Sequence, residues 1–537
     1  MRNNTQILII TGSAGTGKTT SIRKIIENLN HDEIPYYLLA PTGRAAQNLW
    51  NHVGDIAQVA CQTIHSFLYQ PSESDKNSED IIRFDIKELP IDSNAVVIID
   101  EASMLSHETT GDADYLQFGT NNLFDDLLDY LQLKQSTRKL ILIGDTCQLP
   151  PINISKSEVL NPEFIQSKNL IVQHLHLTQV FRQQNDSHLF SNIIQLRENL
   201  ENNNFLKLPI LPDNKEVITL SSDEAIEKYL WQMKNSIFIA HSNQTVQEIN
   251  LTIRKLCGLS PKRLEKKEVL MLVKNSFYQE KRYYNGDMFI VESIGKEEGY
   301  SYDIKNKDNE LVKVNLNFLE VELTHKITGQ YFHTKILANK LWDDKSQATR
   351  EEIIALMINF RQRNPHLIQG TTEYRQAIRK DSYFNAFFMR FGYALTCHKA
   401  QGGEWENVFI NLQRTNNDLK TKGGFTWLYT ALTRASNTAY LIDLPIQKDF
   451  NSSQPFEYFA LEVQQKLQEY GYDMIEQKPL EYELQLFIRK NNVTTGFKFY
   501  RNKIMKITRL MCMKPTNHTQ ELEQILNPFC GKSLLEE

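Results

Sequence analysis

Short apolar runs recur along the chain, and each is followed by residues that favour turns. The runs are 7–10, 36–40, 95–99 and 140–143, and further along 237–240, 408–410 and 439–442. They are uninterrupted rather than alternating, which is typical of strands buried on both faces of a parallel sheet. Helix-favouring stretches such as 21–29 and 45–50 lie between them. The pattern therefore predicts an α/β fold.

The runs fall into two groups, and the second group is interrupted. We predict a first parallel-sheet core over 1–178, with a β-hairpin insert at 66–95 around a polar loop. The second core is predicted from 179–255 and 386–447. Its two halves are separated by 256–385, where the pattern changes.

Within this insertion, 267–325 favours short strands that form a small β-barrel. Turns are expected at 284–287, 295–299 and 307–309. Residues 334–380 are charged and helix-favouring, which predicts a helical projection.

Residues 448–537 form a separate C-terminal region of predicted α+β character. An amphipathic helix is expected over 456–470 and alternating strands over 482–508. Residues 489–514 hold eight basic and no acidic residues, interleaved with Phe497, Phe499 and Tyr500. This segment is either an extra nucleic-acid surface or the solvated face of a small sheet.

Composition excludes several classes of protein. With 537 residues, 41% hydrophobic and 23% charged, the chain is neither disordered nor fibrous. No apolar run approaches the roughly 18 residues that cross a bilayer. The six cysteines are dispersed, which argues against a zinc module or a disulfide framework and predicts a cytoplasmic protein. The net charge of −5 means that any nucleic-acid binding uses local patches.

Residues 7–20 read ILIITGSAGTGKTT, a strand followed by a glycine-rich loop and a helix start. Gly12, Gly17, Lys18 and Thr19 have the spacing of a phosphate-binding loop. Its backbone amides converge on a triphosphate, Lys18 pairs with the β- and γ-phosphates, and the Thr19 hydroxyl ligates Mg²⁺. The predicted nucleotide-binding residues here are Gly12, Ser13, Ala14, Gly15, Thr16, Gly17, Lys18, Thr19 and Thr20.

A second motif places two carboxylates directly after an apolar strand. Asp100 and Glu101 follow the run 95–99, at the strand end where ligands of α/β sheets bind. Asp100 is suited to holding Mg²⁺, and Glu101 to orienting and deprotonating an attacking water. Both carboxylates together predict hydrolysis rather than binding alone.

Several further segments resemble the superfamily 1 helicases, within them the 5′→3′ RecD/Dda branch, and most closely the Bacteroidetes-type RecD-like AAA-family helicases. Order and spacing agree over about 6–443. The segments are Ala40 to Ala46, Thr63 to Phe67, Asp100 to Met104, Gly144 to Pro151, Leu177 to Gln183, Thr396 to Trp405 and Trp427 to Ala435.

The resemblance implies two RecA-like domains, an SH3-like barrel in the insert, and a hairpin at 66–95 that splits the duplex. It implies that Gln148, Arg182 and Arg434 act with Glu101 and Lys18 around the phosphates of ATP. Gly402 and Glu404 are implied to lie near the nucleotide. The implied DNA contacts are Pro41, Thr42, Gly43, Arg44, Thr63, His65, Thr396, His398 and Lys399.

The expected function is an ATP- and Mg²⁺-dependent DNA helicase that moves 5′→3′ on single strands, in repair, recombination or replication. The protein is expected to act as a monomer and not to bind a membrane. The alternatives are an RNA helicase, a translocase that does not unwind, and a recruitment subunit with a protein partner at 448–537. One departure concerns base selectivity. The helix with an adenine-recognising glutamine, which the family carries upstream of the loop, has no counterpart here, and Gln6 lies too close to Gly12 to replace it.

Overall fold

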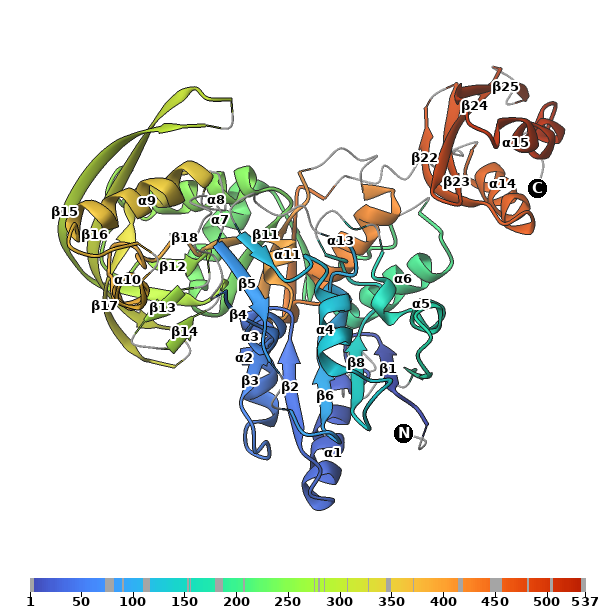
Figure 1. Cartoon of the computed structure of the whole chain (residues 1–537). Coiled ribbons are helices and arrows are strands. Elements are labelled where there is room, and N and C mark those ends of the chain that lie inside the picture. The colour runs from blue at the N-terminus through green and yellow to red at the C-terminus, as the bar shows by residue number, and fades with distance from the viewer. Residues whose placement is uncertain are drawn as a thin grey trace. The chain divides into compact units, whose positions relative to one another are not determined.

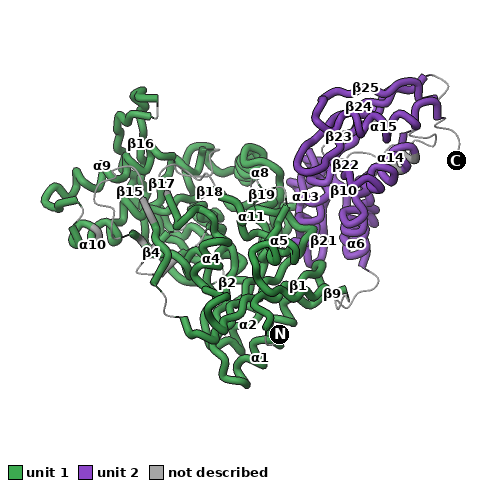
Figure 2. Tube along the Cα trace, turned by 45° about the vertical axis from the view of Figure 1, so that its right-hand side comes forward, with its two compact units in different colours: residues 1–183, 229–405 green, residues 184–228, 406–537 purple. Residues whose placement is uncertain are grey.

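The computed structural model of the chain describes most of its residues. They are 4–72, 82–88, 91–109, 116–151, 154, 156–178, 187–205, 208–274, 276–278, 281–283, 285–306, 308–326, 328–343, 349–369, 371–413, 419–444, 456–480, 482–502 and 506–532. The chain folds into two compact units. The first contains residues 1–183 and 229–405, and the second contains 184–228 and 406–537 (Figure 2).

A six-stranded parallel sheet opens the first unit (Figure 1). Its strand order is β3–β2–β6–β8–β1–β9, and each neighbouring pair is parallel. The strands are β1 (Ile7–Gly12), β2 (Tyr36–Ala40), β3 (Cys61–Thr63), β6 (Val96–Ile99), β8 (Lys139–Gly144) and β9 (Val172–Leu177). The helices between them are α1 (Lys18–His31), α2 (Gly43–Val53), α3 (Ile64–Leu68), α4 (Leu123–Leu131) and α5 (Pro162–Ser167).

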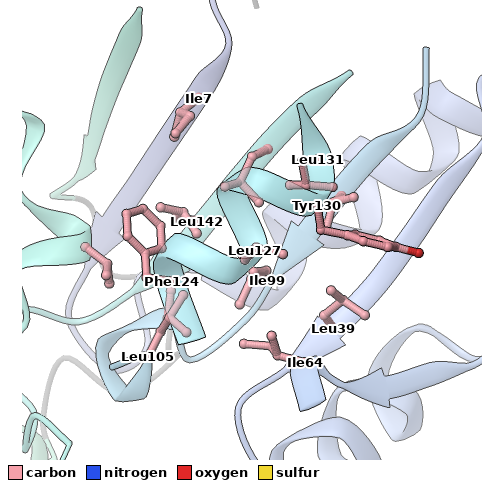
Figure 3. Packing of buried hydrophobic residues seen from close by; sticks show 14 of the residues in the cluster. Ile7, Leu39, Ile64, Ile99, Leu105, Phe124, Leu127, Tyr130, Leu131 and Leu142 are labelled. Atoms are coloured by element: carbon pink, nitrogen blue, oxygen red, sulfur yellow. The ribbon is translucent and has the colours of Figure 1, made fainter. Parts of the chain in front are cut away.

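Successive residues of these strands enter two different cores. Ile7 and Ile9 of β1 pack in the layer that holds Phe124 of α4 (Figure 3). Leu8 and Ile10 pack on the opposite face, in the layer that holds residues of α1 and α2. Because both faces are buried, polar residues cannot alternate along the strands. The predicted parallel α/β core is confirmed.

The hairpin insert is present. β4 (Tyr69–Pro71) pairs antiparallel with β5 (Ile82–Ile86), and β5 pairs with β7 (Leu116–Phe118). Asp126 of α4 anchors the base of the hairpin, because its carboxylate accepts a hydrogen bond of 2.6 Å from the Tyr69 hydroxyl. Most of the predicted wedge loop at 71–80 lies outside the described residues.

The prediction of short strands over 267–325 agrees with the strands within 269–283, but it was wrong for 288–325, which contains two long strands. β15 (Met288–Lys305) and β16 (Leu311–His325) form an antiparallel pair with register shifts at Val291/Ser293 and Ile294/Glu297. The expected turn at 295–299 is therefore a bulged stretch of β15, since a bulge absorbs the extra residue without ending the strand. The sheet order is β17–β16–β15–β12–β18. The other strands are β12 (Val269–Leu272), β13 (Ser276–Tyr278), β14 (Lys281–Tyr283), β17 (Tyr331–Leu337) and β18 (Met389–Phe391).

The helical projection begins later than predicted. Residues 334–337 belong to strand β17, and the helices are α9 (Arg350–Arg363) and α10 (Thr372–Lys380). α9 starts at a capping box in which the Thr349 hydroxyl and the Glu352 carboxylate bind each other's backbone amides. Asn359 of α9 donates a hydrogen bond of 3.0 Å to the Tyr302 hydroxyl of β15, which fixes the helix on the long strands.

Further parallel strands occur in both units. In the first unit β11 pairs in parallel with β19, and in the second unit β10 pairs in parallel with β21. The elements here are α6 (His188–Glu201), β10 (Val217–Leu220), α7 (Ser222–Trp231), β11 (Ser236–Ala240), α8 (Asn243–Leu256), β19 (Ala394–Thr396), α11 (Cys397–Ala400), β20 (Trp405–Asn411), α13 (Lys422–Leu432) and β21 (Ala435–Ile442).

The C-terminal region has the predicted α+β character. Its elements are α14 (Glu457–Glu469), β22 (Asp473–Pro479), β23 (Glu483–Lys490), β24 (Val493–Arg501), β25 (Ile507–Lys514) and α15 (Thr519–Leu526), with the strands in sequential order. Phe497 and Phe499 are fully buried in its core. They are therefore unable to stack on bases, and Lys498 pairs with Glu483 at 3.0 Å. These contacts favour the solvated-face interpretation of 489–514.

A buried ion pair stabilises the first unit. The Arg254 guanidinium of α8 donates to both Glu268 carboxylate oxygens, at 2.6 and 2.9 Å, and both side chains are 1% exposed. Glu268→Ala leaves the guanidinium buried without its counter-charge, so we expect a loss of about 3–5 kcal/mol in unfolding free energy. Lys24→Ala removes an exposed pair with Glu27 on α1 and is expected to cost at most about 1 kcal/mol. Urea unfolding of the two variants checks this, and equal losses would contradict it.

Candidate nucleotide and strand-binding site

The glycine-rich loop joins β1 to α1. Gly15 and Gly17 both have φ near +80°, a left-handed conformation that glycine adopts without strain. A Cβ atom at Gly12 would lie 2.4 Å from the Thr16 Oγ1 atom and 3.0 Å from the Leu177 Cβ atom. The tight turn therefore requires glycine at position 12. It leads into the N-terminus of α1, whose first turn holds no acidic residue and directs free amides into the loop.

Lys18 is the first residue of α1, and its side chain folds back over the loop. The Lys18 ammonium donates to the carbonyl oxygens of Gly12 at 2.9 Å and Ser13 at 2.8 Å. The Thr16 hydroxyl donates to the same Ser13 carbonyl at 2.9 Å. Thr19, in the first turn, is half-buried. The loop thus holds an ammonium and a hydroxyl beside the free amides, which fits a triphosphate with its metal ion.

Asp100 and Glu101 follow β6. The Asp100 carboxylate accepts a hydrogen bond of 2.9 Å from the Glu101 amide. Burial, and next the charge of Glu101, raise the pKa of Asp100 to about 7, while Lys18 opposes this shift. A divalent cation would remove the reason for the shift, because it stabilises the carboxylate form. The predicted roles of Asp100 and Thr19 as Mg²⁺ ligands stay predictions.

Glu101 has a strained backbone, with φ at +51°, and it precedes the short 3₁₀ helix η1 (Ala102–Met104). Its Oε2 atom is buried and has no hydrogen-bond partner among the described residues. Strain and an unsatisfied buried oxygen are both costly to the fold, and they concentrate at functional sites. A carboxylate in this state is suited to accept a proton from water.

Gln401 contacts the backbone next to Gln148, beyond the end of β8. Gln401 donates a hydrogen bond of 2.8 Å from Nε2 to the carbonyl of Leu149, the residue after Gln148. Both glutamines are buried, and both Oε1 atoms lack a partner within the part of the chain that the structure describes. The contact joins 396–405 to the predicted phosphate sensor. Gln401 was not among the predicted site residues, although it lies inside a segment that the sequence had indicated.

Two of the predicted DNA-binding residues, Thr42 and Thr63, cap helices at the same edge of the sheet. The Thr42 hydroxyl accepts from the Ala45 amide at the start of α2, and the Thr63 hydroxyl accepts from the Ser66 amide at the start of α3, both at 3.2 Å. Their strands are neighbours, with Ala40 opposite Thr63. Helix N-termini bind phosphates through backbone amides without reading the bases. Pro41 and Gly43 flank Thr42, and the His65 ring packs against Phe118 at 5.3 Å between centroids.

Other predicted DNA-binding residues lie in β19 and α11. Thr396 is the N-cap residue of α11, and His398 and Lys399 lie within this helix. Burial lowers the pKa of His398, and burial together with the charge of Arg390 lowers the pKa of Lys399 to about 8. An anion such as a phosphate would relieve both effects by supplying the missing counter-charge.

Segment 399–405 packs against α2 within the first unit. Gly402 has φ at +73°, and a Cβ atom there would lie 2.8 Å from the Ala45 Cβ atom. Arg44 donates to the carbonyl oxygens of Gly286 and Lys399 instead of pointing to solvent. The implied place of Glu404 near the nucleotide stays a prediction.

The two predicted arginines have different outcomes. Arg182 lies outside the described residues. Arg434 belongs to the second unit, where it is buried at the end of α13 and donates to the Thr430 carbonyl at 3.1 Å and the Thr433 hydroxyl at 3.0 Å. The meeting of these arginines with Lys18 stays a prediction.

Gln6 has a structural role. Its amide nitrogen donates to the Leu133 carbonyl, and its amide oxygen accepts from the Ile171 amide, both at 2.8 Å. In the described ranges, no helix is both long and apolar enough to cross a membrane. The same ranges contain no cluster of three or more His, Cys, Asp or Glu residues arranged to hold a metal ion.

Comparison with known proteins gives two family matches. Residues 1–208 match the AAA domain model AAA_30, and residues 391–442 match the UvrD-like helicase C-terminal domain. The first match contains the glycine-rich loop, both carboxylates and Gln148. The second contains Thr396, Gln401 and Arg434.

The relatives that match over about four-fifths of the chain include the following three. An uncharacterized protein of Methanocaldococcus jannaschii is 25% identical over 81% of this chain, which spans only 36% of that relative's length. The RecBCD enzyme subunit RecD of Buchnera aphidicola is 25% identical over 80% of this chain and 69% of its own. The ATP-dependent DNA helicase Pif1 of Campylobacter jejuni is 23% identical over 80% of this chain and 87% of its own.

The two domain matches contain the segments that build the site. The chain is thus similar to an AAA domain and to a UvrD-like helicase C-terminal domain over these segments, and to RecD and Pif1 proteins over about four-fifths of its length.

Proposed function

We propose that this protein is an ATP-dependent DNA helicase that moves 5′→3′ along single strands and unwinds duplex. The observation that carries the proposal is that one unit contains both a glycine-rich loop and a Glu101 carboxylate whose Oε2 atom is buried and has no partner among the described residues. The RecD and Pif1 relatives, one of them an ATP-dependent DNA helicase by name, support the substrate.

In this proposal, each residue at the loop acts on ATP or on water. The loop amides and Lys18 bind the phosphates, and Glu101 takes the proton of the attacking water. Thr19 and Asp100 would hold Mg²⁺, which would supply positive charge beside the phosphate oxygens. Gln148 lies where an amide can respond to the γ-phosphate. Arg182 and Arg434 complete the pocket.

Strand binding uses the helix N-termini after Thr42 and Thr63, together with Thr396, His398 and Lys399. Gln401 connects this group to Gln148 through the Leu149 carbonyl. Hydrolysis and strand binding are thereby coupled through one hydrogen bond from the Gln401 side chain to the backbone beside Gln148. The predicted domain boundaries, with RecA-like domains at 1–178 and at 179–255 with 386–447, remain part of the proposal.

The first prediction separates nucleotide binding from hydrolysis. Glu101→Gln is expected to bind ATP normally and to lose about 10²-fold or more in turnover, because the amide cannot accept the proton. Lys18→Ala is expected to lose both properties, and Arg434→Ala about 10³-fold in turnover. Phosphate release and binding of a fluorescent ATP analogue measure these effects. Lys24→Ala, on the exposed face of α1, is the control. Unchanged turnover in Glu101→Gln would remove Glu101 from the catalytic role.

The second prediction concerns Gln401. Gln401→Ala removes one buried hydrogen bond, which is worth up to about tenfold. We expect the stimulation of ATP hydrolysis by single-stranded DNA to fall by about this factor, with little change in hydrolysis without DNA. The measurement is steady-state hydrolysis at saturating and zero DNA. Equal loss under both conditions would instead indicate damage to the nucleotide pocket.

The third prediction addresses substrate and direction. Duplexes with a 5′ or a 3′ tail, of DNA or RNA, are incubated with ATP, and strand displacement is followed by fluorescence. We expect displacement from the 5′-tailed DNA only. Displacement from RNA tails would favour an RNA helicase. ATP hydrolysis stimulated by single strands, without displacement from any duplex, would favour a translocase that does not unwind.

A further inference from the structure

Three segments that are distant in the sequence meet at the side chain of Arg44. One is α2, which carries Arg44 itself, the second is the turn 285–287 of the insertion, and the third is 399–405. The Arg44 Nη2 atom donates to the Gly286 carbonyl, and Nη1 approaches the Lys399 carbonyl at 3.5 Å. The guanidinium carbon lies 5.2 Å from the centroid of the Trp405 ring. The guanidinium thus places its planar face against the Trp405 ring while the N–H groups at its edge point to the two carbonyl oxygens.

Arg44 is half-buried. Burial lowers the pKa of the guanidinium to about 10, and the charge of Asp287 only partly offsets this effect. Arg44 in turn contributes to lowering the pKa of Lys326, where burial is the larger cause. A guanidinium that already donates to protein carbonyls in such a place has fewer donors left for a ligand.

Each of the two neighbouring segments has one position that favours glycine, for a different reason. Gly286 has φ at +101°, a conformation that glycine adopts without strain, while a Cβ atom there would make an ordinary contact of 3.5 Å with the Arg44 Nε atom. At Gly403, a Cβ atom would lie 2.5 Å from the Trp405 ring and 3.1 Å from the Arg44 Cδ atom. A larger residue at Gly403 would therefore displace the Trp405 ring.

We propose that Arg44 is a positioning residue, which fastens turn 285–287 and segment 399–405 onto α2, and that it does not itself bind a strand phosphate. This assignment differs from the role implied by sequence resemblance, and it rests on the proposed strand-binding function. The carbonyl that Arg44 approaches belongs to Lys399, a proposed phosphate contact. Arg44 thereby acts on the strand through the placement of α11.

Substitution of Arg44 by lysine distinguishes a positioning role from phosphate binding. A lysine binds a phosphate well as a point charge, but it lacks the planar fork and stacking surface of arginine. If Arg44 positions the two segments, Arg44→Lys and Arg44→Ala should both weaken binding of a fluorescent oligothymidylate by about ten- to a hundredfold. If Arg44 binds phosphate, Arg44→Lys should bind like the wild type, while Arg44→Ala should lower the slope of log affinity against log salt by about 0.7.

Hydrogen exchange supplies a readout that needs no DNA. In the free protein, we expect faster exchange of the backbone amides in 285–287 and 399–405 in both Arg44 variants. Unchanged exchange in Arg44→Ala, or wild-type binding by Arg44→Lys, would overturn the proposal. The control is Arg23→Lys, because Arg23 also donates to a carbonyl and pairs with Asp55 in a bidentate manner, but on the exposed side of α1. This variant should leave both readouts unchanged.

The two readouts also separate the inference from the proposed function. If the wild type does not bind oligothymidylate, the strand-binding function fails, while exchange in the Arg44 variants still tests the fastening role. If the wild type binds and exchange does not respond to Arg44, only the positioning role fails.

Discussion

The parallel direction of the strands in the first sheet is the constraint on which the site depends. Parallel strands end at the same edge, so the residues that follow β1, β2, β6 and β8 emerge together. The phosphate loop, the Thr42 cap, Asp100 and the Gln148 turn all follow these strands directly. An antiparallel partner at any of these positions would place its following residues at the opposite edge.

The site carries electrostatic and backbone costs that the fold could have avoided. The raised pKa of Asp100, the strained backbone of Glu101 and the buried unpartnered oxygens of Glu101, Gln148 and Gln401 are unfavourable without a ligand. The two hydrophobic layers on either face of the sheet offset these costs. In the proposed function, a nucleotide, a cation and water would supply the partners that these groups lack.

Predictions from local pattern succeeded where one segment decides its own structure. The strand, loop and helix of 7–20 follow from glycine spacing and an apolar run, and α14 follows from its helical periodicity. Predictions from the local pattern were wrong where contacts between distant segments determine the structure. Gly295 and Gly299 indicate a turn by themselves, but pairing with β16 converts this stretch into a bulged strand. Phe497 and Phe499 alternate with basic residues like a binding surface, yet α14 and α15 contribute to the core that buries them.

The sequence by itself determined the chemistry of the phosphate loop and of the carboxylates after β6, because a few neighbouring residues contain everything that this geometry needs. Only the tertiary structure decided what Arg44 and Gln401 contact. Arg44 meets a glycine 242 positions away, and Gln401 meets a carbonyl 252 positions away. No local spacing encodes such meetings. They arise from packing the insertion and segment 399–405 against the first sheet domain, where close approach and burial select each partner.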